Sequence, residues 1–253
     1  MGAIAIVATA QPTPVVAIST QVSSVSVVAG TKAEDFLTQG NEKYEKGDYQ
    51  GAIAAYTQAI VLNPNYVEAY SNRGVARADL GDKQGALADY NEALRINPNL
   101  AEAYNNRGNT RRGLGDKQGA LADYNEALRI NPNLANAYYN RGNTRRGLGD
   151  NQGALADYNE ALRINPNSAD AYSDRGIIRA QSGDNQGALA DFNEALRINP
   201  NYAQAYGNRG NVRAQSGDKQ GAIQDFKKAA DLFKQQEDQD SYQKAMNSLR
   251  KLQ

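Results

Sequence analysis

The sequence predicts an all-α protein built from stacked helical hairpins, and a fixed period of 34 residues is the main observation behind this prediction. The segment 81–99, GDKQGALADYNEALRINPN, returns almost unchanged at 115–133, 149–167 and 183–201. Each copy contains a Gly-Asp turn and an Asn-Pro-Asn break at the same places, and the apolar residues between these breaks follow the period of a helix. One supersecondary unit is therefore stacked on copies of itself.

The composition excludes several functional classes. Lys+Arg and Asp+Glu both total 28, so no excess of positive charge indicates nucleic acid or an anionic membrane as the main partner. The 253 residues include no Cys, His or Trp, which removes thiolate chemistry, imidazole catalysis and the usual zinc sites. We therefore expect a protein that is not an enzyme and that uses no cofactor or metal.

Residues 1–32 precede the repeats and are expected to form a poorly ordered leader or the remnant of a targeting segment. The first charged side chain is Lys32, and the apolar run at 2–8 is shorter than the roughly 20 residues of a membrane-spanning helix. Ala8-Thr9-Ala10 has the pattern of a signal-peptide cleavage site, but no Lys or Arg precedes it. We expect a cytoplasmic protein without a membrane span, with export through a truncated or atypical signal as the alternative.

Alignment of the chain on its own period gives six units without insertions, followed by a C-terminal segment at 237–253. The units are 33–66, 67–100, 101–134, 135–168, 169–202 and 203–236.

The second unit illustrates the order of elements. Asn65, with Glu68 three residues later, is expected to cap a first helix that ends near Asp79. The Gly-Asp turn then breaks this helix, and Asp82 is expected to cap a second helix with one apolar stripe. Pro98 ends the second helix because it disfavours helical backbone at the preceding residue. Each unit is thus a helical hairpin.

Residues at equivalent positions of the units predict how the two helices pack. Gly74 and Ala86 would let the helices approach closely, and Tyr90 would fill the space beyond them. Arg73 and its equivalents flank this core, where they are expected to pair with acids such as Asp89 on the second helix.

The sixth unit departs from the pattern at its end. Lys234 replaces the proline of the other units, so the second helix is expected to continue to about Glu237. The segment 237–253 is then expected to form a helix that caps the array. Its apolar stripe consists of Tyr242, Ala245, Met246, Leu249 and Leu252.

The repeated unit closely resembles the tetratricopeptide repeat, and six in-phase copies over 33–236 support the resemblance. In the second unit the matching residues are Tyr70, Gly74, Gly81-Asp82, Ala86, Tyr90, Ala93 and Pro98. The resemblance implies an α-solenoid, a right-handed superhelix of antiparallel helix pairs. It also implies a concave groove, lined by the first helices, that binds peptides or partner proteins. Arg73 and Arg77 depart from the family pattern, which usually has Leu and Tyr there.

Helix geometry predicts which residues of the first helices face this groove. If Tyr104 and Gly108 face the partner helix, the opposite face is polar and rich in asparagine, which can both donate and accept hydrogen bonds. Such a ladder suits a peptide backbone, and it resembles the asparagine array in the tetratricopeptide domains of O-linked N-acetylglucosamine transferases. Alternatively, these asparagines are solvated residues repeated by duplication. The expected groove residues are Asn41, Asn72, Asn105, Asn106, Asn109, Arg112, Tyr139, Asn140, Asn143, Arg146, Asp174, Asn208 and Asn211.

Two arginines suggest the charge of the ligand. Arg112 and Arg146 fall on the groove face, so acidic or C-terminal carboxylate-bearing peptides are expected there. The two-carboxylate clamp of chaperone-binding modules of this family matches only in its amides, Asn41 and Asn72. Its cationic positions hold Leu37, Glu102 and Asn106.

The expected function is a non-enzymatic scaffold that binds an extended peptide or partner segment in the groove. One alternative is a structural or assembly protein whose end faces stack. A less favoured alternative is a helical-repeat RNA binder, which the neutral charge balance opposes. The oligomeric state is left open.

Overall fold

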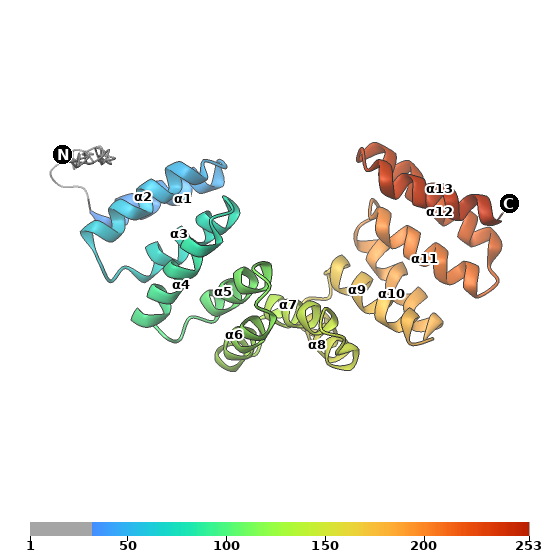
Figure 1. Ribbon diagram of the computed structural model, residues 1–253, viewed down its shortest axis with the longest axis horizontal. Helices are drawn as coiled ribbons and strands as arrows, with labels where there is room; N and C mark the ends of the chain where they lie inside the picture. The colour runs from blue at the N-terminus through green and yellow to red at the C-terminus, as the bar shows by residue number, and fades with distance from the viewer. Residues whose placement is uncertain (1–31, 253) are drawn as a thin grey trace, which may run out of the picture. The chain divides into compact units, whose positions relative to one another are not determined.

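The structure, a computed structural model, describes residues 32–252, which form thirteen α-helices (Figure 1). The first helices of the hairpins are α1 (Ala33–Glu45), α3 (Val67–Asp79), α5 (Ala101–Gly113), α7 (Ala135–Arg146), α9 (Ala169–Gln181) and α11 (Ala203–Gln215). The second helices are α2 (Tyr49–Leu62), α4 (Lys83–Ile96), α6 (Lys117–Ile130), α8 (Asn151–Ile164), α10 (Asn185–Ile198) and α12 (Lys219–Gln235). Helix α13 (Gln239–Leu252) follows them. Apart from Lys32, the expected leader lies outside the described residues.

Each hairpin packs on its neighbours in chain order. The two helices of a hairpin contact each other most extensively, and each second helix contacts the first helix of the next hairpin (Figure 1). The prediction of an all-α solenoid of antiparallel helix pairs is therefore confirmed. Within residues 32–252, no helix is long and apolar enough to cross a bilayer.

The helix caps inside the hairpins agree with the sequence-based prediction, whereas those between hairpins differ from it. The Asp82 carboxylate accepts a hydrogen bond from the Gly85 amide at 2.9 Å, which confirms the expected cap of α4. Asn65 is not the cap of α3, because the helix begins after Tyr66 and has no side-chain cap. The Asn63 side chain accepts from the Asn65 amide at 3.1 Å, and this local turn delays the helix by one residue.

The core of each hairpin is an aromatic ring pressed against a glycine. A Cβ atom added at Gly74 would lie 2.7 Å from the Tyr90 ring, which is closer than packed atoms approach. Tyr90 is 1% exposed and Ala86 is fully buried. The predicted close approach of the two helices is confirmed, and it explains why a helix interior tolerates glycine here.

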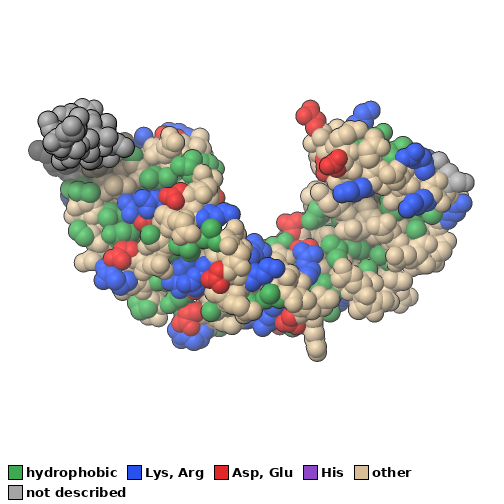
Figure 2. Space-filling view, in the orientation of Figure 1, with side chains coloured by type: hydrophobic (Ala, Val, Ile, Leu, Met, Phe, Trp, Pro, Cys, Tyr) green, Lys and Arg blue, Asp and Glu red, His purple; other side chains and the backbone are tan. Residues whose placement is uncertain are grey.

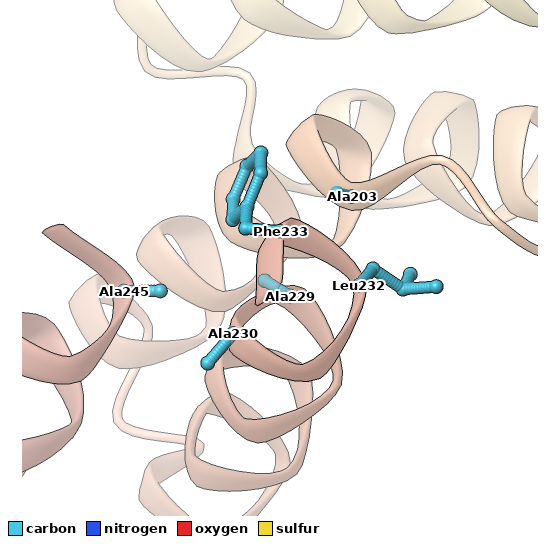
Figure 3. Close-up of a cluster of buried hydrophobic side chains, with 6 residues drawn as sticks. All are labelled: Ala203, Ala229, Ala230, Leu232, Phe233 and Ala245. Atoms are coloured by element: carbon cyan, nitrogen blue, oxygen red, sulfur yellow. The ribbon is translucent and has the colours of Figure 1, made fainter. Parts of the chain in front are cut away.

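The last hairpin is covered by α13. Ala203 of α11, Phe233 of α12 and Ala245 of α13 belong to one buried cluster with three further residues of α12 (Figure 3). Helix α12 has 17 residues where the other second helices have 14, since no proline ends it early. It ends at Gln235, close to the expected end at about Glu237, whose φ of 58° lies in the left-handed region.

A buried carboxylate lies between two arginines in every hairpin from the second onward. Arg73 donates two hydrogen bonds to Asp89, at 3.0 and 2.6 Å, and Arg77 donates a third at 2.8 Å. Arg73 also donates to the Thr57 hydroxyl of the preceding hairpin at 3.0 Å. The predicted pairing is confirmed in all five hairpins, whose carboxylates are Asp89, Asp123, Asp157, Asp191 and Asp225.

Replacement of Asp157 by Ala should destabilise the array strongly. The side chains of Arg141 and Arg145 are 16% and 28% exposed and would lose their shared carboxylate. Breaking such a buried pair costs about 3 kcal/mol, measured as a lower urea midpoint of the helical circular dichroism signal. Glu160→Ala removes only the exposed partner of Arg163, so it should leave the midpoint nearly unchanged. Equal effects of the two substitutions would contradict this assignment.

Two glycine-to-alanine substitutions should have opposite effects on stability. Gly74→Ala places a methyl group against the buried Tyr90 ring and should cost about 1–3 kcal/mol. Gly207 lies inside α11, and a Cβ added there meets nothing within 4 Å. Gly207→Ala should therefore stabilise the chain by about 0.5–1 kcal/mol through the gain in helix propensity. Thermal unfolding of both variants tests this, and changes of the same sign would refute it.

Candidate functional site

Several of the predicted groove residues line hollows on the first helices. Asn41 and Asn72 line one hollow of about 260 Å³, and Asn106 and Asn109 line another of about 160 Å³. A third hollow, near the C-terminal end, is lined by residues that include Asp174, Asn208 and Asn211.

Three of the predicted asparagines are bonded to the core. The side-chain oxygens of Asn41, Asn109 and Asn143 accept hydrogen bonds from tyrosine hydroxyls of the second helices. The donors are Tyr56, Tyr124 and Tyr158, at 2.8, 2.8 and 2.7 Å. Each bond fixes the amide with its oxygen toward the core, which leaves the NH₂ groups of Asn41 and Asn109 free to donate.

Burial shifts the titration of these tyrosines. It raises the pKa of the Tyr56 and Tyr124 hydroxyls to about 12, because the charged form would lose its hydration. The pKa of Tyr139 is also raised to about 12, mainly by burial. The tyrosine that faces each of the three asparagines is therefore a hydrogen-bond donor at neutral pH.

Other amides bond to each other across neighbouring hairpins. Asn72 donates to Asn41 at 3.0 Å, and Asn140 donates to Asn105 at 3.0 Å. Asn105 in turn donates to Asn106 at 3.2 Å. Asn105 was expected to face the groove, but its side chain is only 7% exposed, because it lies at the contact between α5 and the next hairpin.

The predicted basic character of the groove is reduced by an ion pair between hairpins. Arg146 pairs with Asp174 at 3.3 Å, and the Tyr139 hydroxyl donates to the other carboxylate oxygen at 3.0 Å. Burial raises the pKa of Asp174, while Arg146 and the Tyr139 hydroxyl act against this shift. Arg112 has no ion-pair partner within 4 Å among residues 32–252, so it alone keeps the expected free positive charge.

Asn208 and Asn211 differ from the other predicted amides. Phe226 stands where the first four hairpins have tyrosine, so no hydroxyl reaches Asn211. In the described part of the chain, neither amide has a side-chain hydrogen-bond partner. The hollow that they line has a volume of about 360 Å³.

Sequence reasoning missed most residues of this hollow, among them Gly207 of α11 and Lys244 of α13. Gly207 could have been found by comparing the repeats, because the same position holds Leu37, Ser71, Asn105, Tyr139 and Ser173 in the other units. Lys244 gave no such signal, since α13 has no counterpart in the repeated pattern.

The chemistry available on this face is hydrogen bonding by amides, with a few charges. Among the described residues, no group of three or more His, Cys, Asp or Glu side chains could hold a metal ion. Acidic and basic side chains are interspersed on the face shown in Figure 2. The site is thus equipped for recognition of polar groups.

Family models for repeats match most of the chain. A model described as TPR repeat matches 40–81, and models described as tetratricopeptide repeat match 67–100, 101–134, 123–156, 147–206 and 203–236. A stretch of 44 residues is 43% identical to human serine/threonine-protein phosphatase 5. This stretch is 17% of the chain and 9% of the phosphatase, so the likeness concerns a short repeat region of that enzyme.

Solved structures resemble the described fold. MamA is 27% identical with a TM-score of 0.58, covering 68% of this chain and 94% of MamA. YrrB, a TPR protein with an unusual peptide-binding site, is 26% identical with a TM-score of 0.61. The match covers 76% of this chain and 98% of YrrB. PilF of Pseudomonas aeruginosa has a TM-score of 0.76 at 15% identity, and the match covers 85% of this chain and 96% of PilF. This match shows a likeness of fold alone.

The buried tyrosines make stability sensitive to alkaline pH. Their pKa is about 10 in the unfolded chain and about 12 for Tyr56, Tyr124 and Tyr139 in the folded chain. The folded state thus binds these protons more tightly, and stability should fall as the pH rises from about 10 to 12. Tyrosinate absorbance and helical circular dichroism, followed together, should show these groups ionising as the helices unfold. Ionisation of all tyrosines near pH 10 with intact helices would contradict the prediction.

Proposed function

Because this chain belongs to the tetratricopeptide repeat family, whose repeats generally mediate protein binding, we propose that it is a scaffold that binds an extended segment of a partner protein. The segment lies along the face of the first helices. The observation that carries the proposal is the row of side-chain amides on this face, several of which keep unused donors or acceptors.

The bonded amides offer both kinds of hydrogen-bonding group. The Asn41 oxygen already accepts from Tyr56 and Asn72, so its NH₂ group is left to donate. Asn72 uses its NH₂ group in that bond, so its oxygen is left to accept. A peptide backbone presents both N–H and C=O groups, and it can satisfy such a surface without a particular side-chain sequence.

The positive charge of Arg112 favours a partner segment that is negatively charged. Arg146 is already paired with Asp174, so it contributes little free charge to the groove. Arg112 is half-buried and can bind a carboxylate of the partner, from an acidic side chain or a chain terminus. We therefore keep an acidic segment as the proposed ligand, with Arg112 as its main contact.

The exposed face of α1 opposes the alternative of end-to-end stacking. Asp35 and Glu42 of α1 are exposed, and they occupy the positions that Ala69 and Ala76 fill as buried residues in the next hairpin. A polar first face cannot replace the apolar contact between hairpins. The equal totals of Lys+Arg and Asp+Glu, 28 each, likewise give no support to an RNA-binding role.

Groove substitutions should weaken partner binding without unfolding the chain. Asn106→Ala, Asn140→Ala and Arg112→Glu together should lower affinity roughly 100-fold, since each removes about 1 kcal/mol of polar contact. The partner is first captured on the wild-type chain from the source organism, identified by mass spectrometry, and titrated as the purified protein.

The matched control carries Gln84→Ala, Gln118→Ala and Arg129→Glu, which alter exposed side chains of the second helices. This control should bind the partner as the wild type does. Unchanged affinity of the groove variant, with an intact helical circular dichroism signal, would refute the proposed function.

A further inference from the structure

We infer that the hollow between α9, α11 and α13 is a specificity pocket for one bulky apolar side chain of the bound segment, next to an acidic side chain of the same segment. The inference rests on the proposed function of the groove and adds the chemistry of the ligand at one place. It is carried by the space, floor, rim and charge of this hollow.

The space exists because Gly207 has no side chain. A Cβ at this position would meet no atom within 4 Å, whereas unit 1 has Leu37 and unit 4 has Tyr139 here. The hollow of about 360 Å³ lies within the range of roughly 300–1,000 Å³ typical of ligand pockets. A second hollow of about 210 Å³ shares Ile177, Asn208 and Asn211 with it. The face is therefore open over two consecutive hairpins.

The floor of the pocket is apolar. It includes Ile177 of α9, Phe226 and Phe233 of α12, and Ala245 of α13. Phe226 and Phe233 are 3% and 5% exposed, so their rings are fixed in the core beneath the opening. At the position of Phe226 the first four hairpins have a tyrosine hydroxyl, and at the position of Ile177 they have Asn or Val. This change of residues converts a polar face into an apolar one.

The rim of the pocket carries amides that are not used within the fold. Asn140 donates to Asn105 of the preceding hairpin, but the residue that corresponds to this acceptor for Asn208 is the buried Ser173. Asn211 has no tyrosine donor. Across residues 32–252 both side chains lack a bonded partner, so they can bind the main chain of a segment whose side chain enters the pocket.

Lys244 supplies a positive charge at the rim. Lys244 of α13 is exposed and lines the pocket, and Asp238, the residue just before α13, is an acid whose pKa Lys244 helps to lower. Asp174 also lines the pocket, but its two oxygens contact Tyr139 and Arg146. Lys244 therefore remains available to an Asp or Glu side chain of the ligand.

Selection from a random peptide library tests this inference. Random 12-residue peptides are displayed on phage, fused at their C-termini so that every carboxylate is a side chain, and are selected on the full chain. Enriched peptides should share a bulky apolar residue next to Asp or Glu. A synthetic copy of the most enriched peptide is then titrated against variants of the full chain.

The variants fill the pocket or reverse its charge. Gly207→Leu should lower the affinity for the peptide at least about tenfold, and Gly207→Ala should lower it about threefold. Ser71→Leu, at the same position of unit 2, should change this affinity less than about twofold. Lys244→Glu should lower the affinity for the peptide several-fold, whereas Lys251→Glu, on the same helix but outside the pocket, should leave this affinity unchanged. Helical circular dichroism reports whether each variant is folded.

Enriched peptides without an apolar position, or full affinity of Gly207→Leu, would overturn the inference. If such peptides still lose binding to the Asn106→Ala, Asn140→Ala, Arg112→Glu variant, the proposed function stands while the pocket does not. Failure of the wild-type chain to enrich any peptide would count against both.

Discussion

The structure depends on a carboxylate buried between two arginines. Asp89 accepts three hydrogen bonds, from Arg73 and Arg77, and the same arrangement recurs in the four hairpins that follow. A buried charge is tolerated only when it is fully paired, and these geometries meet that condition. Arg73 also lies 5.5 Å from the centre of the Tyr70 ring and donates to Thr57 of the preceding hairpin. One side chain thus joins the core of a hairpin to the contact between hairpins.

The core and the candidate groove are connected through the tyrosines. The Tyr124 ring packs against Gly108, and its hydroxyl donates to Asn109, the next residue of α5. A groove asparagine can therefore be held in place by the same residue that fills the core. Phenylalanine in place of this tyrosine, as at Phe226, keeps the ring packed against the glycine but lacks the hydroxyl that holds the amide. The repeat has a structural part that is kept in every copy and a polar part that single substitutions can change.

A few residues that differ between the nearly identical units make the surface of the array differ from one hairpin to the next. The middle hairpins carry the Arg146–Asp174 pair, and the last two carry Ile177 and Gly207 at positions that are polar or filled elsewhere. In addition, α13 contributes Lys244 to the same face without belonging to the repeat. Selectivity for a partner then depends on where these departures fall along the stack, while the repeated residues maintain the stack itself.

The sequence by itself determined the hairpins, their Gly–Tyr cores and the Arg–Asp pairs, because these depend on local periodicity and on residues within one unit. Only the tertiary structure decided which groove amides are free, since the partners of Asn105 and Arg146 come from the next hairpin, 35 and 28 residues away. The same holds for the hollow at Gly207, which is lined by residues of four helices. Hydrogen bonds within a unit repeat with the sequence, whereas contacts between units depend on two different copies and on how they are stacked.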